Sequence, residues 1–123
     1  QDADNSVMIL GGKVSPAHMS VDGFLAEQML DHLSADHTFM GASAIDEAGS
    51  LYCYDDKYAS LLKKLLAVSH RLVVLAEHSK LGATSLVRVS RMDERFSLIT
   101  GEQAPEALLD RYRELGVKIT KTC

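Results

Sequence analysis

The chain has 123 residues, of which 46% are hydrophobic and 24% charged, so it can bury the core of one domain and lacks the composition of a disordered protein. Its formal net charge of −4 argues against a surface built mainly for nucleic acid, because phosphate contacts need clustered Lys and Arg. No apolar run approaches the roughly 20 residues that cross a bilayer. The two cysteines, Cys53 and Cys123, form neither a zinc motif nor a disulfide framework. We therefore expect one domain over residues 1–123, in a reducing cytoplasm.

The first half of the chain alternates short apolar runs with one helical pattern. A strand is predicted at residues 7–10, where VMIL precedes a Gly-Gly pair. Apolar residues then recur at helical spacing over residues 23–33, so we expect an amphipathic helix on a core there. A second strand is predicted at residues 37–40. The small and acidic residues that follow, 42–50, are typical of a loop.

The second half begins with the most regular helical pattern of the chain. Asp55 or Asp56 can cap this helix, which is expected to run to about residue 69 because Leu and Val recur at steps of three and four. Residues 72–76 are an unbroken run rich in Val and Leu, which predicts a strand buried on both faces. The remaining predicted elements are strands at 86–89 and 96–100, a helix that begins near Pro105 and stops at Gly116, and a strand at 117–120.

This alternation of strands and helices predicts an α/β fold with a mainly parallel sheet and helices on both faces, because parallel neighbours need crossover connections. In such sheets, ligands bind beyond the carboxyl ends of the strands. The predicted strand ends carry glycines, acids and lysines that together suit a small polyhydroxylated anion.

Each residue type at these strand ends has a chemical use. Glycines let backbone N–H groups approach a phosphate, Lys80 or Lys13 supplies a positive charge, and Asp46 or Glu77 can accept hydrogen bonds from sugar hydroxyls. Asp46 fits a turn acid equally well, and the Gly-Gly pair at 11–12 fits a simple turn. The histidines show no ligand spacing and no dinucleotide fingerprint is present, so we expect neither a metal nor a cofactor.

Five stretches, in this order and spacing, resemble the effector-sensing domain of the DeoR family of bacterial transcriptional repressors. They are VMILGG at 7–12, SVDGFLAEQML at 20–30, DHTFMGASAIDEAGSL at 36–51, RLVVLAEHSKLG at 71–82 and FSLITGE at 96–102. The resemblance implies the sensor fold that is shared with ribose-5-phosphate isomerase. It also implies that the chain is the second half of a sensor, without the winged helix-turn-helix, the opening strand and the Gly-Thr-Thr phosphate loop.

The resemblance also implies a set of effector-binding residues. They are Gly11, Gly12, Gly41, Asp46, Glu77, Ser79 and Lys80. The sequence departs from the family pattern where Glu77 replaces the usual Asp, Ala44 the usual Gly and Leu62 a usual Lys. The longer Glu77 side chain moves its carboxylate by about 1.5 Å, which alters ligand preference.

The first hypothesis is therefore a sensor that binds a phosphorylated sugar or related metabolite and controls operator binding by an absent N-terminal domain. On this hypothesis the protein is not an enzyme, reaches DNA only through that domain, forms a homo-oligomer and contacts no membrane. The alternative is an enzyme of the same fold, a sugar-phosphate isomerase that acts through Asp46 and Lys80. A third hypothesis is a structural piece whose apolar edges mediate subunit contact.

Overall fold

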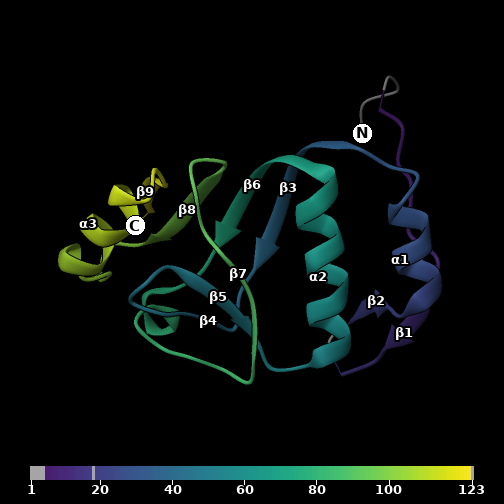
Figure 1. The fold of residues 1–123 in the computed structure, drawn as a ribbon, viewed down its shortest axis with the longest axis horizontal. Coiled ribbons are helices and arrows are strands. Elements are labelled where there is room, and N and C mark those ends of the chain that lie inside the picture. The colour runs from purple at the N-terminus through teal and green to yellow at the C-terminus, as the bar shows by residue number, and fades with distance from the viewer. Residues whose placement is uncertain (1–4, 18, 123) are drawn as a thin grey trace.

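A four-stranded parallel sheet forms the centre of the protein (Figure 1). The computed structural model describes residues 5–17 and 19–122, so Cys123 lies outside the described residues. The strand order is β3-β6-β8-β9, and each neighbouring pair is parallel. The strands are β3 (Ala35–Gly41), β6 (Ser69–Leu75), β8 (Phe96–Gly101) and β9 (Lys118–Thr122). The predicted α/β class with a mainly parallel sheet is confirmed.

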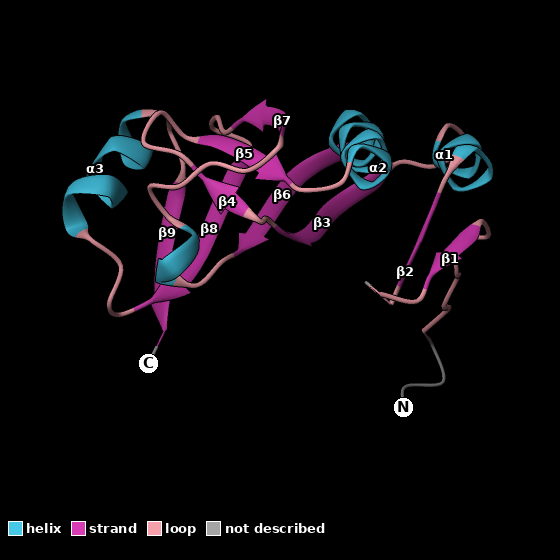
Figure 2. Ribbon diagram, turned by 90° about the horizontal axis from the view of Figure 1, so that it is seen from below, coloured by secondary structure: helices cyan, strands magenta, loops and turns pink. Residues whose placement is uncertain are grey.

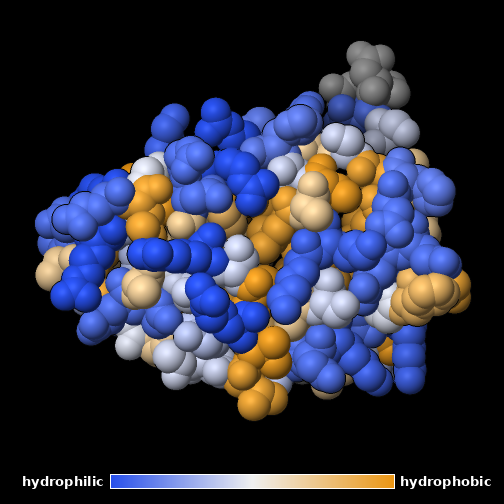
Figure 3. Space-filling view, in the orientation of Figure 1, coloured by the Kyte–Doolittle hydropathy of each residue, from blue (hydrophilic) through white to orange (hydrophobic). Residues whose placement is uncertain are grey.

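The main core lies on one face of this sheet. Its strand residues are at alternate positions, as the period of two requires, and include Leu72, Val74 and Leu98, which have no exposed surface. They pack against helix α2 (Asp56–Val68) through Leu62 and Leu66, and against helix α3 (Glu106–Glu114). In the described residues, both helices that contact the sheet therefore belong to the layer on this face. Figure 3 shows that hydrophilic residues cover most of the face in view, with hydrophobic ones beside α2 and in smaller groups toward both ends.

The opposite face of the sheet is largely open among the described residues. Phe39 of β3 is 68% exposed and Leu75 of β6 is 48% exposed, whereas Leu72 of the same strand is fully buried. The prediction that residues 72–76 are buried on both faces is therefore wrong. A Val- and Leu-rich run indicates a strand, but it does not reveal whether the rest of the chain covers both faces.

A second, antiparallel sheet lies beside the parallel one (Figure 2). Its order is β4-β5-β7, and it comprises β4 (Ala44–Ile45), β5 (Ser50–Cys53) and β7 (Val87–Arg91). Residues 42–50 are thus not a plain loop, because they include β4 and the turn of a hairpin. The strand predicted at 86–89 exists as β7, but it pairs with β5 and not with the parallel sheet. Ile45, Leu51 and Val89 of this small sheet belong to the main core.

The prediction of a strand at residues 7–10 is wrong. Val7 and Ile9 are 75% and 80% exposed, and no strand includes them in the part of the chain that the structure describes. A strand needs a partner for its backbone groups, and among the described residues this run has none. The chain instead forms a hairpin of β1 (Lys13–Ser15) and β2 (Ser20–Asp22), followed by helix α1 (Phe24–Leu30). This helix packs on α2 in a small separate cluster.

The helix predictions are confirmed, with shorter bounds. Helix α1 ends at Leu30, because the amides of the next residues bond three positions back and close the helix with tighter turns. Asp55 caps α2, and its carboxylate accepts a 2.9 Å hydrogen bond from the amide of Lys57. Pro105 stands directly before α3, and Gly116 follows the last turn in a left-handed conformation. None of the described helices is long and apolar enough to cross a membrane.

Candidate functional site

The carboxyl ends of the parallel strands lie together at one edge of the sheet. Gly41 at the end of β3 pairs with Leu75 at the end of β6, and Leu75 pairs with Ile99 of β8. The segment after β6 forms a short 3-10 helix, η1 (His78–Lys80), so the polar residues Glu77 to Lys80 begin at this edge. The arrangement matches the place where open parallel sheets bind ligands.

A pocket of about 220 Å³ lies at the end of β3 and beside η1. Three parts of the chain meet the end of β3 there: strand β5, helix α2 and the turn that carries Lys80. The pocket is lined by Gly41, Ala42, Ser43, Tyr52, Cys53, Tyr58, Leu62 and Lys80. The structure thus brings together two of the predicted site residues, Gly41 and Lys80. The pocket has one cationic corner, a segment of small residues and an aromatic and aliphatic wall.

The backbone at Lys80 is fixed by a hydrogen bond and by a buried neighbour. Its amide donates a 2.9 Å hydrogen bond to the carbonyl oxygen of Glu77, and the buried Leu81 follows it as an anchor. The Lys80 side chain is half-buried, and within residues 5–17 and 19–122 it has no hydrogen-bond or ion-pair partner. A fixed backbone with an uncompensated ammonium group at a pocket suits the capture of an anion.

Asp46 lies in the β4–β5 turn and does not line this pocket. One of its carboxylate oxygens accepts a hydrogen bond from the amide of Ser50, and the other accepts one from the hydroxyl of Tyr52, both at 2.9 Å. The second bond raises the pKa of Tyr52, because the carboxylate stabilises the protonated phenol. Asp46 therefore reaches the pocket through Tyr52, which lines it.

The β4–β5 hairpin is also fixed from the side of α3. The hydroxyl of the buried Tyr112 donates a 2.9 Å hydrogen bond to the carbonyl oxygen of Asp46. Burial raises the pKa of Tyr112 to about 12, so this hydroxyl is a neutral donor at physiological pH. The hairpin that contains Tyr52 is thus connected to the core through Tyr112.

Glu77 lies in a different hollow, of about 400 Å³, at the ends of β6, β8 and β9. This hollow is lined by Leu75, Ala76, Glu77, Ile99, Thr100, Gly101 and Thr122. It shares no lining residue with the Lys80 pocket, and Ser79 is exposed and lines neither. The expected single group of Asp46, Glu77, Ser79 and Lys80 is therefore divided along the edge of the sheet. A role for Glu77 or Ser79 in binding stays a prediction.

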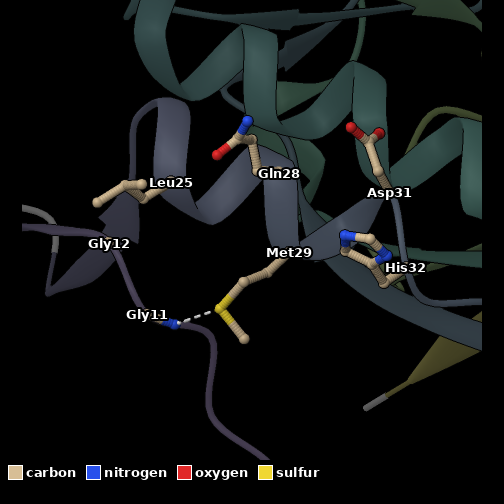
Figure 4. A pocket seen from close by; sticks show the side chains of 7 residues that line it. All are labelled: Gly11, Gly12, Leu25, Gln28, Met29, Asp31 and His32. Atoms are coloured by element: carbon tan, nitrogen blue, oxygen red, sulfur yellow. Dashed lines mark hydrogen bonds between the residues drawn. The ribbon is translucent and has the colours of Figure 1, made fainter.

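Gly11 and Gly12 lie in a third place, between the N-terminal segment and helix α1 (Figure 4). The hollow there has a volume of about 500 Å³, and the amide of Gly11 donates a 3.1 Å hydrogen bond to the sulfur of Met29. A Cβ at Gly12 would come within 3 Å of Val21 and Ala26. The lack of a side chain at Gly12 thus has a packing reason, and the Lys80 pocket includes neither glycine.

The pocket residues that do not belong to the predicted set are Ala42, Ser43, Tyr52, Cys53, Tyr58 and Leu62. Two of them could have been found from the sequence. Leu62 is a position where the sequence departs from the family pattern, and Tyr58 lies four residues before it, on the same face of the predicted helix. Across the described residues, no group of three or more His, Cys, Asp or Glu side chains is arranged to hold a metal ion.

A parallel α/β sheet with a cation-bearing pocket beyond its carboxyl edge is typical of a ligand-binding domain. The sequence model of the DeoR C terminal sensor domain matches residues 1–102, and the chain belongs to this family.

Three curated relatives are similar to the chain. It is 28% identical, over 93% of its length, to the HTH-type transcriptional regulator GolR of Listeria innocua, of which it spans 45%. It is 27% identical, over 94% of its length, to the HTH-type transcriptional repressor GlcR of Bacillus subtilis, of which it also spans 45%. It is 28% identical, over 79% of its length, to the glycerol-3-phosphate regulon repressor of Haemophilus influenzae, of which it spans 39%. The chain thus spans less than half of the length of these relatives.

Proposed function

We propose that the chain is the second half of the effector-sensing domain of a DeoR-type transcriptional regulator, and that it binds a phosphorylated sugar or related metabolite in the Lys80 pocket. The observation that carries the proposal is the unpaired Lys80 ammonium group at a preformed pocket beyond the strand ends. The name of one relative, a glycerol-3-phosphate regulon repressor, refers to a phosphorylated polyol and supports this ligand class.

In this proposal, different residues of the pocket bind different parts of the ligand. The phosphate takes the corner of Lys80, where a charge-assisted hydrogen bond is strong because the group is half-buried. The carbon skeleton lies against Tyr52 and Tyr58, whose rings offer an apolar face. The volume of about 220 Å³ is below the roughly 300–1,000 Å³ of sites for drug-sized ligands. The pocket therefore suits a metabolite of the size of one monosaccharide.

Regulation follows if the ligand has different affinities for the operator-binding and the released states, since only differential affinity shifts such an equilibrium. In this proposal DNA is bound by an N-terminal winged helix-turn-helix outside these 123 residues, and the regulator works in the cytoplasm as a homo-oligomer. The exposed Phe39 and Leu75 on the open sheet face support the existence of further contacts. Sizing chromatography with light scattering of the full-length protein tests the oligomer, and a monomeric mass would contradict it.

The test of the ligand class is a thermal-shift series on the full-length protein. The probes are glucose 6-phosphate, fructose 6-phosphate and glycerol 3-phosphate, each beside the matched compound without phosphate. A ligand at about 100 times its Kd stabilises the folded state by about 2.7 kcal/mol. We expect a rise of melting temperature with at least one phosphorylated probe, absent in Lys80→Ala. A set of probes that leaves the melting temperature unchanged, or a rise that Lys80→Ala retains, contradicts the proposal.

The isomerase-like alternative needs Asp46 and Lys80 at the same substrate. Instead, both carboxylate oxygens of Asp46 are occupied in the hairpin, and the Lys80 pocket is lined by Tyr52 and not by Asp46. This division favours a sensor over an enzyme. We propose that the same sugar phosphates bind without turnover, which nuclear magnetic resonance of the mixture after overnight incubation would check. Formation of an isomer that ceases in Lys80→Ala would establish the enzyme instead.

A further inference from the structure

We propose that Tyr52 is the specificity-determining residue of the Lys80 pocket, that it accepts a hydrogen bond from a hydroxyl group of the ligand, and that Asp46 is a positioning residue that acts through Tyr52. The inference rests on the proposed function, since it takes the Lys80 pocket as the effector site. It adds that the phosphate of the ligand lies at Lys80 and a hydroxyl group at Tyr52. It also assigns to Asp46 a role other than direct contact with the ligand.

The first step of the argument is the geometry of the Asp46 carboxylate. Its two oxygens accept one hydrogen bond each, from the Ser50 amide and the Tyr52 hydroxyl, at 2.9 Å. The side chain of the buried Ser50 accepts a 2.9 Å hydrogen bond from Nε of Arg88. Tyr52 and Arg88 are thus connected through Asp46 and Ser50, which accept their hydrogen bonds, and Ser50 also donates its amide to Asp46.

The backbone supports the same orientation. The pairing of β5 with β7 shifts its register between Leu51 and Tyr52, and such an irregularity re-aims the side chain that follows it. Leu51 is buried in the core, whereas Tyr52 is half-buried and lines the pocket. On the far side of the turn, Tyr112 holds the Asp46 carbonyl oxygen. The carboxylate that fixes Tyr52 is therefore itself fixed to the core.

The direction of the Tyr52 hydrogen bond decides what the pocket recognises. A carboxylate only accepts hydrogen bonds, so the phenolic proton of Tyr52 is committed to Asp46. The phenolic oxygen is left with acceptor capacity alone. It favours a donor, such as a sugar hydroxyl, and repels a phosphate oxygen. Lys80, which lines the same pocket, favours the phosphate. The two residues thus set one orientation for a ligand that carries a phosphate at one end and a hydroxyl at the other.

The experiment measures binding to the full-length protein by titration calorimetry. The probes are glucose 6-phosphate, glycerol 3-phosphate and inorganic phosphate, and the variants are Tyr52→Phe, Asp46→Asn, Asp46→Ala and the double variant Asp46→Ala with Tyr52→Phe. Tyr52→Phe keeps the ring and removes only the oxygen, so we expect about a tenfold loss of affinity for the organic phosphates. Affinity for inorganic phosphate, which has only the Lys80 corner to occupy, is expected to stay within about twofold of wild type.

The Asp46 variants separate positioning from direct contact. An Asn side chain can accept from the Ser50 amide only with its NH2 group turned toward Tyr52, which reverses that hydrogen bond and frees the phenolic proton, so Asp46→Asn is expected to lose about as much affinity as Asp46→Ala. Asp46→Ala is expected to lose as much as Tyr52→Phe, and the double variant no more than either, because one shared interaction is removed. Losses that multiply in the double variant would show that Asp46 touches the ligand independently of Tyr52 and would overturn the inference.

A second measurement needs no ligand. The pKa of Tyr52 is raised by its bond to Asp46, so its ultraviolet titration, taken as the difference between wild type and Tyr52→Phe, reports the contact. We expect the midpoint to move down in Asp46→Ala, and an unchanged midpoint overturns the inference. If no probe binds wild-type protein, the proposed function fails, and this titration still decides whether Asp46 positions Tyr52.

Discussion

The amide of Gly82 donates a 2.7 Å hydrogen bond to the carbonyl oxygen of Ile45 in strand β4. Leu81 forms an isolated parallel bridge with the same residue. The turn that contains Lys80 is therefore bonded to the β4–β5 hairpin, and this hairpin also contains Tyr52, which lines the pocket. Lys80 and Tyr52 are thus linked through backbone contacts to one hairpin, and a change at this junction should affect both stability and binding.

Gly82→Ala tests the junction. Gly82 has a φ of +76°, and a Cβ there would lie 3.1 Å from Cδ1 of Leu108, so Ala would be strained and crowded. We expect the free energy of unfolding to fall by about 1–3 kcal/mol in urea titrations. The matched control is Gly101→Ala, where no atom lies within 4 Å of the added Cβ. The control should stay within about 0.5 kcal/mol of wild type. Equal effects of the two substitutions would contradict this account of the junction.

The two faces of strand β6 give the second prediction. Leu72 is fully buried against the main core, whereas Leu75, three residues along the same strand, is 48% exposed on the open face. Leu72→Ala should lower the free energy of unfolding by about 2–5 kcal/mol, because it leaves a cavity. Leu75→Ala is its control, with an expected loss below about 1 kcal/mol, since the site has solvent to fill it. Urea unfolding of the 123-residue chain measures both, and similar losses would contradict this assignment of the two faces.

These two leucines also show how far the sequence predicts the fold. The strand that contains them was predicted because an unbroken Val- and Leu-rich run of this length is typical of a parallel strand. Its burial on both faces did not follow, since coverage of a face depends on which other segments pack there. The run at residues 7–10 failed for a related reason, because a strand exists only with a partner for its backbone.

The sequence predicts only part of the candidate site. Gly41 directly follows one predicted strand, and Lys80 lies in the turn after the next, so the parallel topology brings them to the same edge of the sheet. Tyr52 belongs to a hairpin whose first strand has only two residues, too short for any period to appear in the sequence. Whether Asp46 faces a ligand or its own turn depends on hydrogen bonds that no spacing rule reveals.

The third prediction concerns regulation in the full-length protein. Lys80→Ala removes the charge at the pocket without opening the core, because the side chain is only half-buried and has no ion-pair partner among the described residues. We expect operator binding in gel shifts to be retained and its release by a sugar phosphate to be lost. Lys63→Ala, on the exposed side of helix α2, is the control and should respond as wild type does. Release that persists in Lys80→Ala argues against this lysine as the anion contact.

The last prediction uses the buried Tyr112. Burial raises its pKa to about 12 in the folded state, above the ordinary value of 10.0. A group whose pKa is raised on folding contributes stability below its unfolded pKa, and this contribution is lost as pH rises toward its folded pKa. The free energy of unfolding should therefore fall more steeply between about pH 10 and 12 in the wild type than in Tyr112→Phe.

At neutral pH, Tyr112→Phe should cost about 1–3 kcal/mol, because the Asp46 carbonyl oxygen loses its 2.9 Å partner inside the fold. Urea unfolding at a series of pH values measures both effects on the same samples. Parallel pH profiles of the wild type and Tyr112→Phe would mean that this hydroxyl ionises as readily in the folded state as in the unfolded one, and that it does not hold the hairpin.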